Sequence, residues 1–401
     1  MVNPVNADSG VLPLKGVTVV DLTQVLAGPF ATMMLGDMGA EVIKIEPVGR
    51  GDRSRSFRPS PTYFDAVNRN KRSVAIDLKS EDGQEFAHRL LADADVFIES
   101  TKFGRPATYD LSYESVSETN PEIIYCSIAG FGHDSPYREV PAWDMLIQAM
   151  SGVMSMTGES DGPPLWSGLP SGDLTAGMYA AQSVLATLFA RERGRIDGEW
   201  IEVPMLDALI SWLTSRAGHS FGLDEPFPRG GVRHPSIAPF GVFECADERM
   251  VVAAATDSLW ANLCAAIDRP DLMADERFEE LADRVEHVDA LTEELEAVFG
   301  EHPIDEWLDL LQAHDVPAGP IHDTVSVWED DHVRQRQLRQ TMEREGRQDA
   351  EVIDHPVNFT ELTTELAVAP QQVGESTDAL LKRHGYDPAE IERLRDQDIV
   401  G

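Results

Sequence analysis

Short apolar runs alternate with amphipathic segments along the first half of the chain. Residues 17–22 and 41–46 have the length and the β-branched content of buried strands. Between them, Pro29 opens an apolar segment over residues 30–38 that predicts a helix, and Gly39 ends it. The order strand, helix, strand is typical of a βαβ unit with two parallel strands.

The same alternation continues downstream. The pattern predicts strands over residues 73–78, 95–98 and 123–128 and a helix over residues 81–92. Strands and helices in alternation indicate a mostly parallel, Rossmann-like sheet covered on both faces. No GxGxxG motif follows the first strand, so a nicotinamide or flavin site is not supported.

Two later segments suggest how the chain is organised. Apolar residues at helical spacing from Leu174 to Leu188 predict a long buried helix that ends at Gly194. The stretch 222–241 is rich in proline and glycine and breaks the pattern, so we expect a domain junction there.

The composition is strongly acidic, with 70 Asp and Glu against 33 Lys and Arg and a net charge of -37. Nucleic acid is therefore an unexpected partner. Such a surface is typical of halophiles, because concentrated salt screens the repulsion, and we expect a salt-rich cytoplasm. The three cysteines are widely spaced and indicate neither disulfides nor zinc. The sequence shows no export signal and no membrane-spanning run, so we expect a cytoplasmic protein.

One segment departs from this acidity. Residues 50–72 carry seven Arg or Lys and two acids, and we call this segment the basic island. It is either a loop whose arginines pair with neighbouring carboxylates or a site for a small polyanion, since Arg and Lys side chains bind phosphates well.

Asp173 is the candidate for chemistry, since it lies in Ser171-Gly172-Asp173 directly before the long helix. An aspartate there is ordinarily an N-cap. The helix dipole would also keep it ionised and available as a nucleophile. Ser171 is one place late for a GxSxG nucleophile elbow, and the histidines lack HExxH spacing, so neither a serine hydrolase nor a metal site is expected.

Several separated motifs, in one order, resemble the class III CoA-transferases, the family of formyl-CoA transferase and carnitine CoA-transferase. The matching stretches are LKGVTVVDLTQVLAGPFATMMLGDMGAEVIKIEPVGRGD, NRNKRSVAIDLKS, IAGFGHDSPY, WDMLIQAMSGVMSMTG followed by SGD, and HPSIAPFGVF. The resemblance implies a large α/β domain formed by residues 1–222 and 330–401, with a smaller α/β domain of residues 223–329 inserted in it. It also implies an interlocked homodimer.

By this resemblance, Asp173 is the covalent nucleophile. It would attack an acyl-CoA thioester to give a mixed anhydride, then an aspartyl-CoA thioester, and finally pass CoA to a second carboxylic acid. Coenzyme A is then a co-substrate, no tightly bound cofactor is expected, and the partners are an acyl-CoA and a small acid.

The resemblance also implies where CoA binds. The matched contact positions are Leu26, Ala27, Ile76 to Lys79, Ser100 to Lys102 and Thr108, with Trp143 and Asp144 near the thioester. Pro47 and Thr108 replace arginines of the family pattern, so we expect Arg50, Lys102 or Arg105 to bind phosphate instead. Within the island, Arg50 would compensate for Pro47. We expect Lys71 and Arg72 to shape the CoA groove, and Arg58 to contribute least to CoA affinity.

For the donor and acceptor acids, the sequence offers candidate binding residues and a substrate class. Gln24, Gly230 and Gly231 are candidates for substrate contact or for a glycine-rich closing loop, and Arg233 or His234 could neutralise a second carboxylate. Succinyl-CoA as donor with mesaconate, malate or citramalate as acceptor suits this family and an archaeal halophile.

Two alternatives stay open. A 2-methylacyl-CoA racemase shares the resemblance, but it uses a histidine where this chain has Trp143, and tryptophan cannot transfer the α-proton. The second alternative is a protein that binds CoA esters without catalysis. Such a protein would not need Asp173 and the motif around it, which this chain retains.

Overall fold

A computed structural model describes residues 10–58 and 62–401. The chain divides into two compact units. Unit 1 comprises residues 1–151, 168–214 and 332–401, and unit 2 comprises residues 152–167 and 215–331. Residues 152–167, 215–222 and 330–331, which the sequence suggested for the large domain, group with unit 2.

Unit 1 is built on a six-stranded sheet with the order β3-β2-β1-β4-β5-β6, and all its neighbouring strands are parallel. The strands are β1 (Thr18–Leu22), β2 (Glu41–Glu46), β3 (Lys71–Ala75), β4 (Val96–Glu99), β5 (Ile124–Ala129) and β6 (Glu199–Pro204). The predicted parallel α/β sheet is therefore confirmed.

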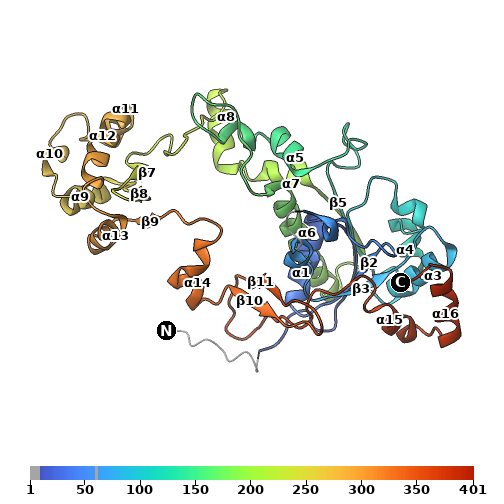
Figure 1. Ribbon diagram of the computed structural model, residues 1–401. Coiled ribbons are helices and arrows are strands. Elements are labelled where there is room, and N and C mark those ends of the chain that lie inside the picture. Colours follow the sequence, from blue (N-terminus) through green and yellow to red (C-terminus); the bar gives the residue numbers. More distant parts are fainter. Residues whose placement is uncertain (1–9, 59–61) are drawn as a thin grey trace. The chain divides into compact units, whose positions relative to one another are not determined.

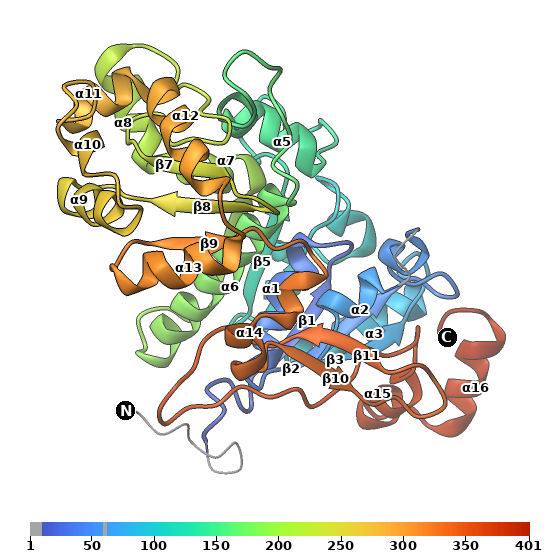
Figure 2. The same ribbon diagram turned by 60° about the vertical axis from the view of Figure 1, so that its left-hand side comes forward.

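Helices connect these strands (Figure 1). They are α1 (Ala27–Asp37), α2 (Tyr63–Val67), α3 (Glu81–Ala92), α4 (Tyr113–Thr119), α5 (Asp144–Ser151), α6 (Ser171–Glu192) and α7 (Met205–Ser211). The C-terminal part adds α14 (Asp331–Gln335), the antiparallel pair β10 (Arg339–Met342) and β11 (Ala350–Ile353), α15 (Thr377–Arg383) and α16 (Pro388–Asp396), which Figure 2 shows from a second side.

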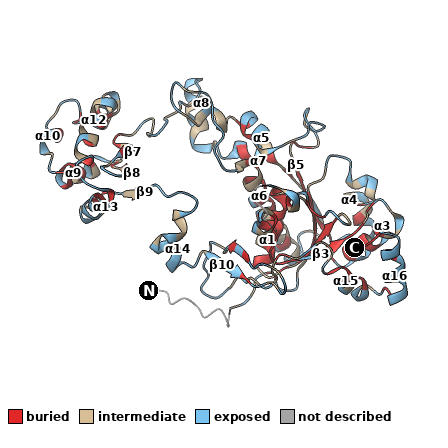
Figure 3. Cartoon of the chain, in the orientation of Figure 1, coloured by how far each residue is buried: buried red, intermediate tan, exposed pale blue. Residues whose placement is uncertain are grey.

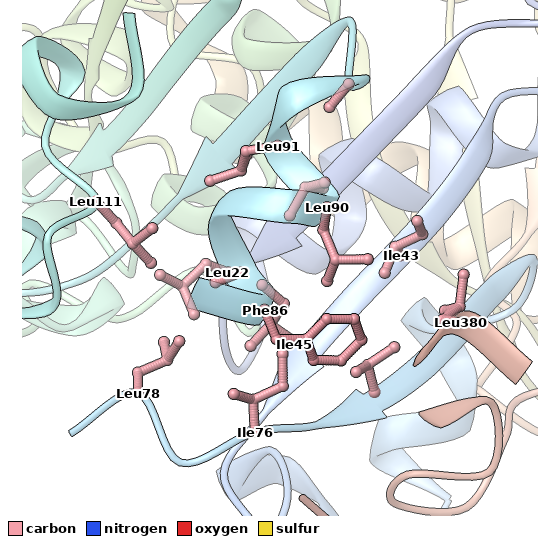
Figure 4. Packing of buried hydrophobic residues seen from close by; sticks show 14 of the residues in the cluster. Leu22, Ile43, Ile45, Ile76, Leu78, Phe86, Leu90, Leu91, Leu111 and Leu380 are labelled. Carbon is pink, nitrogen blue, oxygen red and sulfur yellow. The ribbon is translucent and has the colours of Figure 1, made fainter. Parts of the chain in front are cut away.

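Helices cover both faces of the sheet. On one face, Phe86 and Leu90 of α3 pack onto Ile43 and Ile45 of β2, as Figure 4 shows, and Leu380 of α15 joins the same buried cluster. On the other face, α1 and α6 lie side by side, and both contact strands of the sheet. Buried residues accordingly concentrate on the sheet and on these two helices (Figure 3).

Unit 2 has a core of its own around a three-stranded antiparallel sheet. Its strands are β7 (Phe240–Glu244), β8 (Arg249–Ala253) and β9 (Ala318–Pro320), and its helices are α8 (Thr214–Leu223), α9 (Asp257–Ala266), α10 (Pro270–Met273), α11 (Leu281–Glu286), α12 (Val288–Phe299) and α13 (Ile304–Ala313). Trp260, Phe299 and Trp307 fill this core. Within the described parts of the chain, no helix has the length and apolar character needed to cross a bilayer.

Candidate active site

A cavity of about 1210 Å³ opens in unit 1 where the parallel strands end. Its lining includes Leu22, Glu46, Glu99 and Ala129, which are the last residues of β1, β2, β4 and β5. The strand order reverses between β1 and β4, and open α/β sheets bind ligands outside the carboxyl ends of the strands at this point. The volume exceeds that of ordinary small-molecule pockets and suits an extended ligand.

Most of the predicted site residues meet at this cavity. Those that line it are Gln24, Ala27, Arg50, Ile76, Lys79, Ser100, Lys102, Trp143, Asp144 and Asp173. They come from segments up to 149 residues apart in sequence, from Gln24 to Asp173. The sequence gives the order of these motifs, and the fold brings them together at one cavity.

Four residues that were predicted to contact CoA or to shape its groove lie outside the lining: Leu26, Lys71, Arg72 and Thr108. Leu26 is buried beside Met33 and Val67. Thr108 uses its hydroxyl to donate to the carbonyl of Arg105 at 2.8 Å. Arg72 is exposed and pairs through Nε with Glu41 at 3.2 Å. The assignment of these residues to CoA stays a prediction that their positions do not support.

Gly230, Gly231, Arg233 and His234 belong to unit 2. A Cβ on Gly230 would lie 2.2 Å from the carbonyl oxygen of Arg233, and Gly231 has a φ of +58°, so the turn itself requires both glycines. Arg233 pairs with Asp289 at 2.5 Å. The His234 ring stacks on Phe240, and burial together with the Arg216 charge lowers its pKa. Their predicted roles in loop closure and acid binding remain predictions.

Asp173 is the third residue of α6, whose N-cap is Pro170. The N-cap interpretation is therefore wrong, because the helix begins three residues earlier than the sequence suggested. The N–H of Gly172 donates instead to Oδ1 of Asp144 at 2.8 Å, so a side chain from α5 satisfies the start of the helix. The Asp173 carboxylate is left to face the cavity.

The environment of Asp173 raises its pKa to about 7. Burial is the main cause, the Asp144 charge adds to it, and the backbone N–H of Ala27 opposes both. The expectation that the helix terminus keeps this carboxylate fully ionised is thus wrong near neutral pH. A carboxyl that titrates near 7 inside a cavity is typical of a catalytic group.

Asp144 is itself tightly oriented. Its Oδ2 accepts a hydrogen bond from Nε2 of Gln148 at 2.7 Å, and the same amide donates to the carbonyl of Leu169 at 2.8 Å. Gln148 is fully buried. The pair of neighbouring carboxylates at the helix ends is therefore a fixed feature of the site.

Cationic side chains also line the cavity. They are Arg50, Arg53, Lys79, Lys102, Arg105 and Arg138. Arg50 and Arg53 stand at the exposed rim and carry the positive charge expected of a phosphate-binding edge. Across residues 10–58 and 62–401, no group of three His, Cys, Asp or Glu side chains could hold a metal ion.

The basic island proves to be of two kinds. Arg55 forms a bidentate pair with Glu46, Arg69 forms another with Asp37, and Lys71 pairs with Asp21 at 3.1 Å. These three cations are neutralised by buried acids, whereas Arg50 and Arg53 face the cavity. The pairing interpretation is therefore confirmed for Arg55, Arg69 and Lys71, and the polyanion site stays a prediction for Arg50 and Arg53.

Two further residues that were not among the predicted site residues bear on the site: Arg53 lines the cavity, and Tyr63, outside the lining, interacts electrostatically with Asp173. Arg53 lies in a short 3-10 helix, Arg53–Ser56, and lines the cavity. Tyr63 opens α2, and the charges of Asp173, Asp144 and Asp52 help burial to raise the pKa of its phenol. Arg53 could have been found as a member of the island, but nothing local in the sequence points Tyr63 toward Asp173.

The chain matches the family described as CoA-transferase family III over residues 14–377. It is 37% identical over 363 residues to a succinyl-CoA:mesaconate CoA-transferase of Haloarcula hispanica, covering 87% of this chain and 90% of that protein. It is 35% identical over 389 residues to a succinyl-CoA:glutarate CoA-transferase of Mus musculus, covering 95% and 89%.

Solved structures agree with the sequence comparison. A CAIB/BAIF family protein from Brucella suis superposes with a TM-score of 0.86 at 33% identity, covering 94% of this chain and 100% of that one. The match of sequence, fold and site order leads to one conclusion: the chain belongs to CoA-transferase family III and is a class III CoA-transferase.

Proposed function

We propose that the enzyme moves CoA from succinyl-CoA to a C4 or C5 dicarboxylic acid, with Asp173 as the covalent nucleophile. The observation that carries the mechanism is a half-buried carboxyl with a pKa of about 7, facing a cavity at the switch point of the sheet. The relatives support the substrate class, since two of them are named for succinyl-CoA with mesaconate or with glutarate.

The first half of the reaction exchanges one activated acid for another. An ionised Asp173 oxygen attacks the thioester carbonyl, the C–S bond breaks, and CoA leaves as the thiolate while a mixed anhydride forms. The thiolate then attacks the Asp173 carbonyl of the anhydride. The donor acid departs as its carboxylate, and an aspartyl-CoA thioester remains.

The second half reverses these bonds with the acceptor. The acceptor carboxylate attacks the aspartyl thioester, which releases the thiolate and forms a second anhydride. Attack of the thiolate on the acceptor's carbonyl gives the new acyl-CoA and frees Asp173. Each step breaks one acyl bond and makes another, so no phosphate donor is needed.

The residues around Asp173 suit these steps. When a thiolate attacks the Asp173 carbonyl, negative charge develops on its oxygen, and the Ala27 N–H is placed to stabilise that charge. The thiolate must approach past Asp144, whose position is fixed by Gln148. We assign the phosphates of CoA to the rim that Arg50 and Arg53 form, and the pantetheine arm to the cavity between that rim and Trp143.

A direct exchange assay tests the proposal. Succinyl-CoA is mixed with mesaconate, glutarate, malate, citramalate or oxalate, and the new CoA thioester is followed by chromatography. We expect turnover with the C4 and C5 dicarboxylates and little with oxalate. Exchange of deuterium at the α-carbon without formation of a new thioester would instead indicate racemase chemistry.

The Asp173→Asn variant tests the nucleophile, and we expect it to lose activity by about 10⁴-fold or more. The matched control is Asp378→Asn, which removes a surface charge paired with Arg395. Folding raises the pKa of Asp173, so this carboxyl favours the folded state below its ordinary pKa and loses that contribution as the pH rises through about 7. The Asn variant should therefore be at least as stable as the parent at pH 8, and an active Asp173→Asn enzyme would refute the mechanism.

A further inference from the structure

The segment between β1 and α1 leads to Ala27, which lines the cavity together with Asp173 and whose N–H lowers the pKa of that carboxyl. This segment is held by side chains rather than by regular structure. The carbonyl of Thr23 accepts a hydrogen bond from Nζ of Lys44 at 2.8 Å. The N–H of Gln24 donates to Oγ of Ser100 at 3.3 Å. A lysine of β2 and the residue that follows β4 thus fix the first half of this segment.

Val25 is the unusual residue of the segment. Its φ is +70°, a left-handed conformation that β-branched side chains avoid. Its N–H points at the carboxylate of Asp52, with distances of 3.2 Å to Oδ1 and 3.3 Å to Oδ2. A strained residue keeps its conformation only where its surroundings enforce it, and this carboxylate is the group in contact with its N–H.

Asp52 is built as a fixed acceptor. It is 1% exposed, its Oδ2 pairs with Nζ of Lys44 at 3.1 Å, and its Oδ1 accepts the N–H and the hydroxyl of Ser54 at 2.8 and 2.7 Å. Lys44 is equally buried. The same lysine therefore binds the carbonyl of Thr23 and orients the acceptor of the Val25 N–H, so one buried ion pair holds both sides of the strained residue.

The segment is also in close contact with the helix of the nucleophile. A Cβ on Gly177 of α6 would lie 2.6 Å from the carbonyl oxygen of Ala27, so α6 approaches this backbone as closely as only glycine permits. Gly177 is four residues after Asp173, on the same face of α6. The position of Ala27 relative to the Asp173 carboxylate therefore depends on the backbone that Val25 sets.

We infer that Asp52, oriented by Lys44, is a positioning residue for the transfer reaction: it holds Val25 in its left-handed conformation and thereby aims the Ala27 N–H at the nucleophile. The inference rests on the proposed role of Asp173. It assigns a task to a buried ion pair that lies outside the cavity lining, and it requires that loss of the pair slow the chemical steps more than it weakens binding.

The experiment compares Asp52→Asn with the double variant Asp52→Asn/Val25→Gly. A misplaced hydrogen-bond donor should lower kcat of the single variant by about 10- to 100-fold, with KM for succinyl-CoA changed by less than about threefold. Glycine adopts a positive φ without strain, so the double variant should recover at least about fivefold of the lost kcat. Recovery by glycine is a result that a merely destabilised core would not give.

Asp37→Asn is the matched control, because Asp37 is also 1% exposed and also pairs with a buried cation, Arg69. We expect it to lower the melting temperature by a similar amount and to keep kcat within about twofold of the parent. If Asp52→Asn fails to fold, Ser54→Ala replaces it, with an expected loss of about threefold in kcat that Val25→Gly again restores.

A normal kcat in Asp52→Asn, or in Ser54→Ala where that variant replaces it, would overturn the inference, and so would a loss that Asp37→Asn shares and glycine does not restore. Asp173→Asn is measured in parallel. If it is inactive while Asp52→Asn is fully active, only the positioning role falls; if both are active, the proposed nucleophile falls as well.

Discussion

On one face of the central sheet, Val20 and Ile43 pack under α3 in a wholly apolar layer, whereas the residues beside them, Asp21 and Lys44, face the other way and are paired by charge. Both layers are almost completely shielded from solvent. The strands alternate between the two layers residue by residue, as the pleat of a strand requires.

The difference lies in what each layer can specify. Apolar contacts are non-directional, so the α3 face supplies stability and tolerates changes of shape. The charged face is directional: Asp21 accepts hydrogen bonds from Thr23 at 2.5 Å and from Thr32 at 2.7 Å while it pairs with Lys71. A buried ion pair is weak evidence of stability, so we infer that this face serves to fix the backbone that leads into the active site.

The largest effect is expected from breaking one partner on each face. Lys71→Met leaves the buried Asp21 with less compensation and should reduce the free energy of unfolding by about 3–5 kcal/mol. Phe86→Ala, which removes a fully buried ring from the apolar face, should cost about 3–5 kcal/mol as well. Chemical denaturation at pH 7 measures both.

The two losses should differ in their pH dependence. The lysines lower the pKa of Asp21 far below its ordinary value, so its contribution to stability is present above that value and is lost as the pH falls. Lys71→Met should therefore lose less stability than the parent between about pH 5 and about pH 2, whereas Phe86→Ala should follow the parent. Equal pH dependence in both variants would mean that the charged face is no more than additional packing.

The apolar face could be predicted from the sequence, and the charged face could not. The strands of residues 17–22 and 41–46 and the helix of residues 81–92 follow from local periodicity, and the structure places them within one or two residues. Lys44 interrupts the apolar residues of Glu41–Glu46, but that pattern alone does not show what the lysine pairs with. Its partner Asp52 and the Asp21–Lys71 pair depend on strand order, which periodicity does not reveal.

The same limit applies to the site. Asp173 and most cavity residues could be identified by resemblance, because their motifs are contiguous. The start of α6 was misplaced because the group that satisfies Gly172 is Asp144, 28 residues earlier. Strand β6 was missed because only Val203 within Glu199–Pro204 is buried, so its apolar pattern is weak.

A smaller effect should appear in the pH dependence of activity, where the two buried regions differ again. The pKa of Asp173 is about 7, so kcat/KM should fall below that pH, to about one tenth of its plateau at pH 6. Asp144→Asn removes the neighbouring charge that raises this pKa, and Asn can still accept the Gly172 N–H. The acid limb should move to lower pH, with a several-fold larger fraction of the plateau retained at pH 6.

The control for this profile is Phe86→Leu on the apolar face. It alters packing without changing any charge near Asp173, so its acid limb should coincide with that of the parent. An acid limb that Asp144→Asn leaves in place would mean that another group controls the rate. Tyr63 also interacts electrostatically with Asp173, so Tyr63→Phe would then be measured next.

The smallest effect is expected at the rim, where the cations of the basic island are not buried. Arg50→Gln or Arg53→Gln should each raise KM for the CoA ester by about three- to tenfold with kcat unchanged, because an exposed charge on a phosphate contributes modestly and binds substrate and transition state alike. The matched control is Arg58→Gln: its guanidinium donates to the carbonyl of Phe57 and lies outside the cavity lining. The difference between rim and control should shrink in molar salt, since screening weakens exposed pairs first. Equal increases in KM at Arg50, Arg53 and Arg58 would show that the island attracts CoA through its overall positive charge. Only the buried, charged face of the sheet would then contain charges whose individual positions matter.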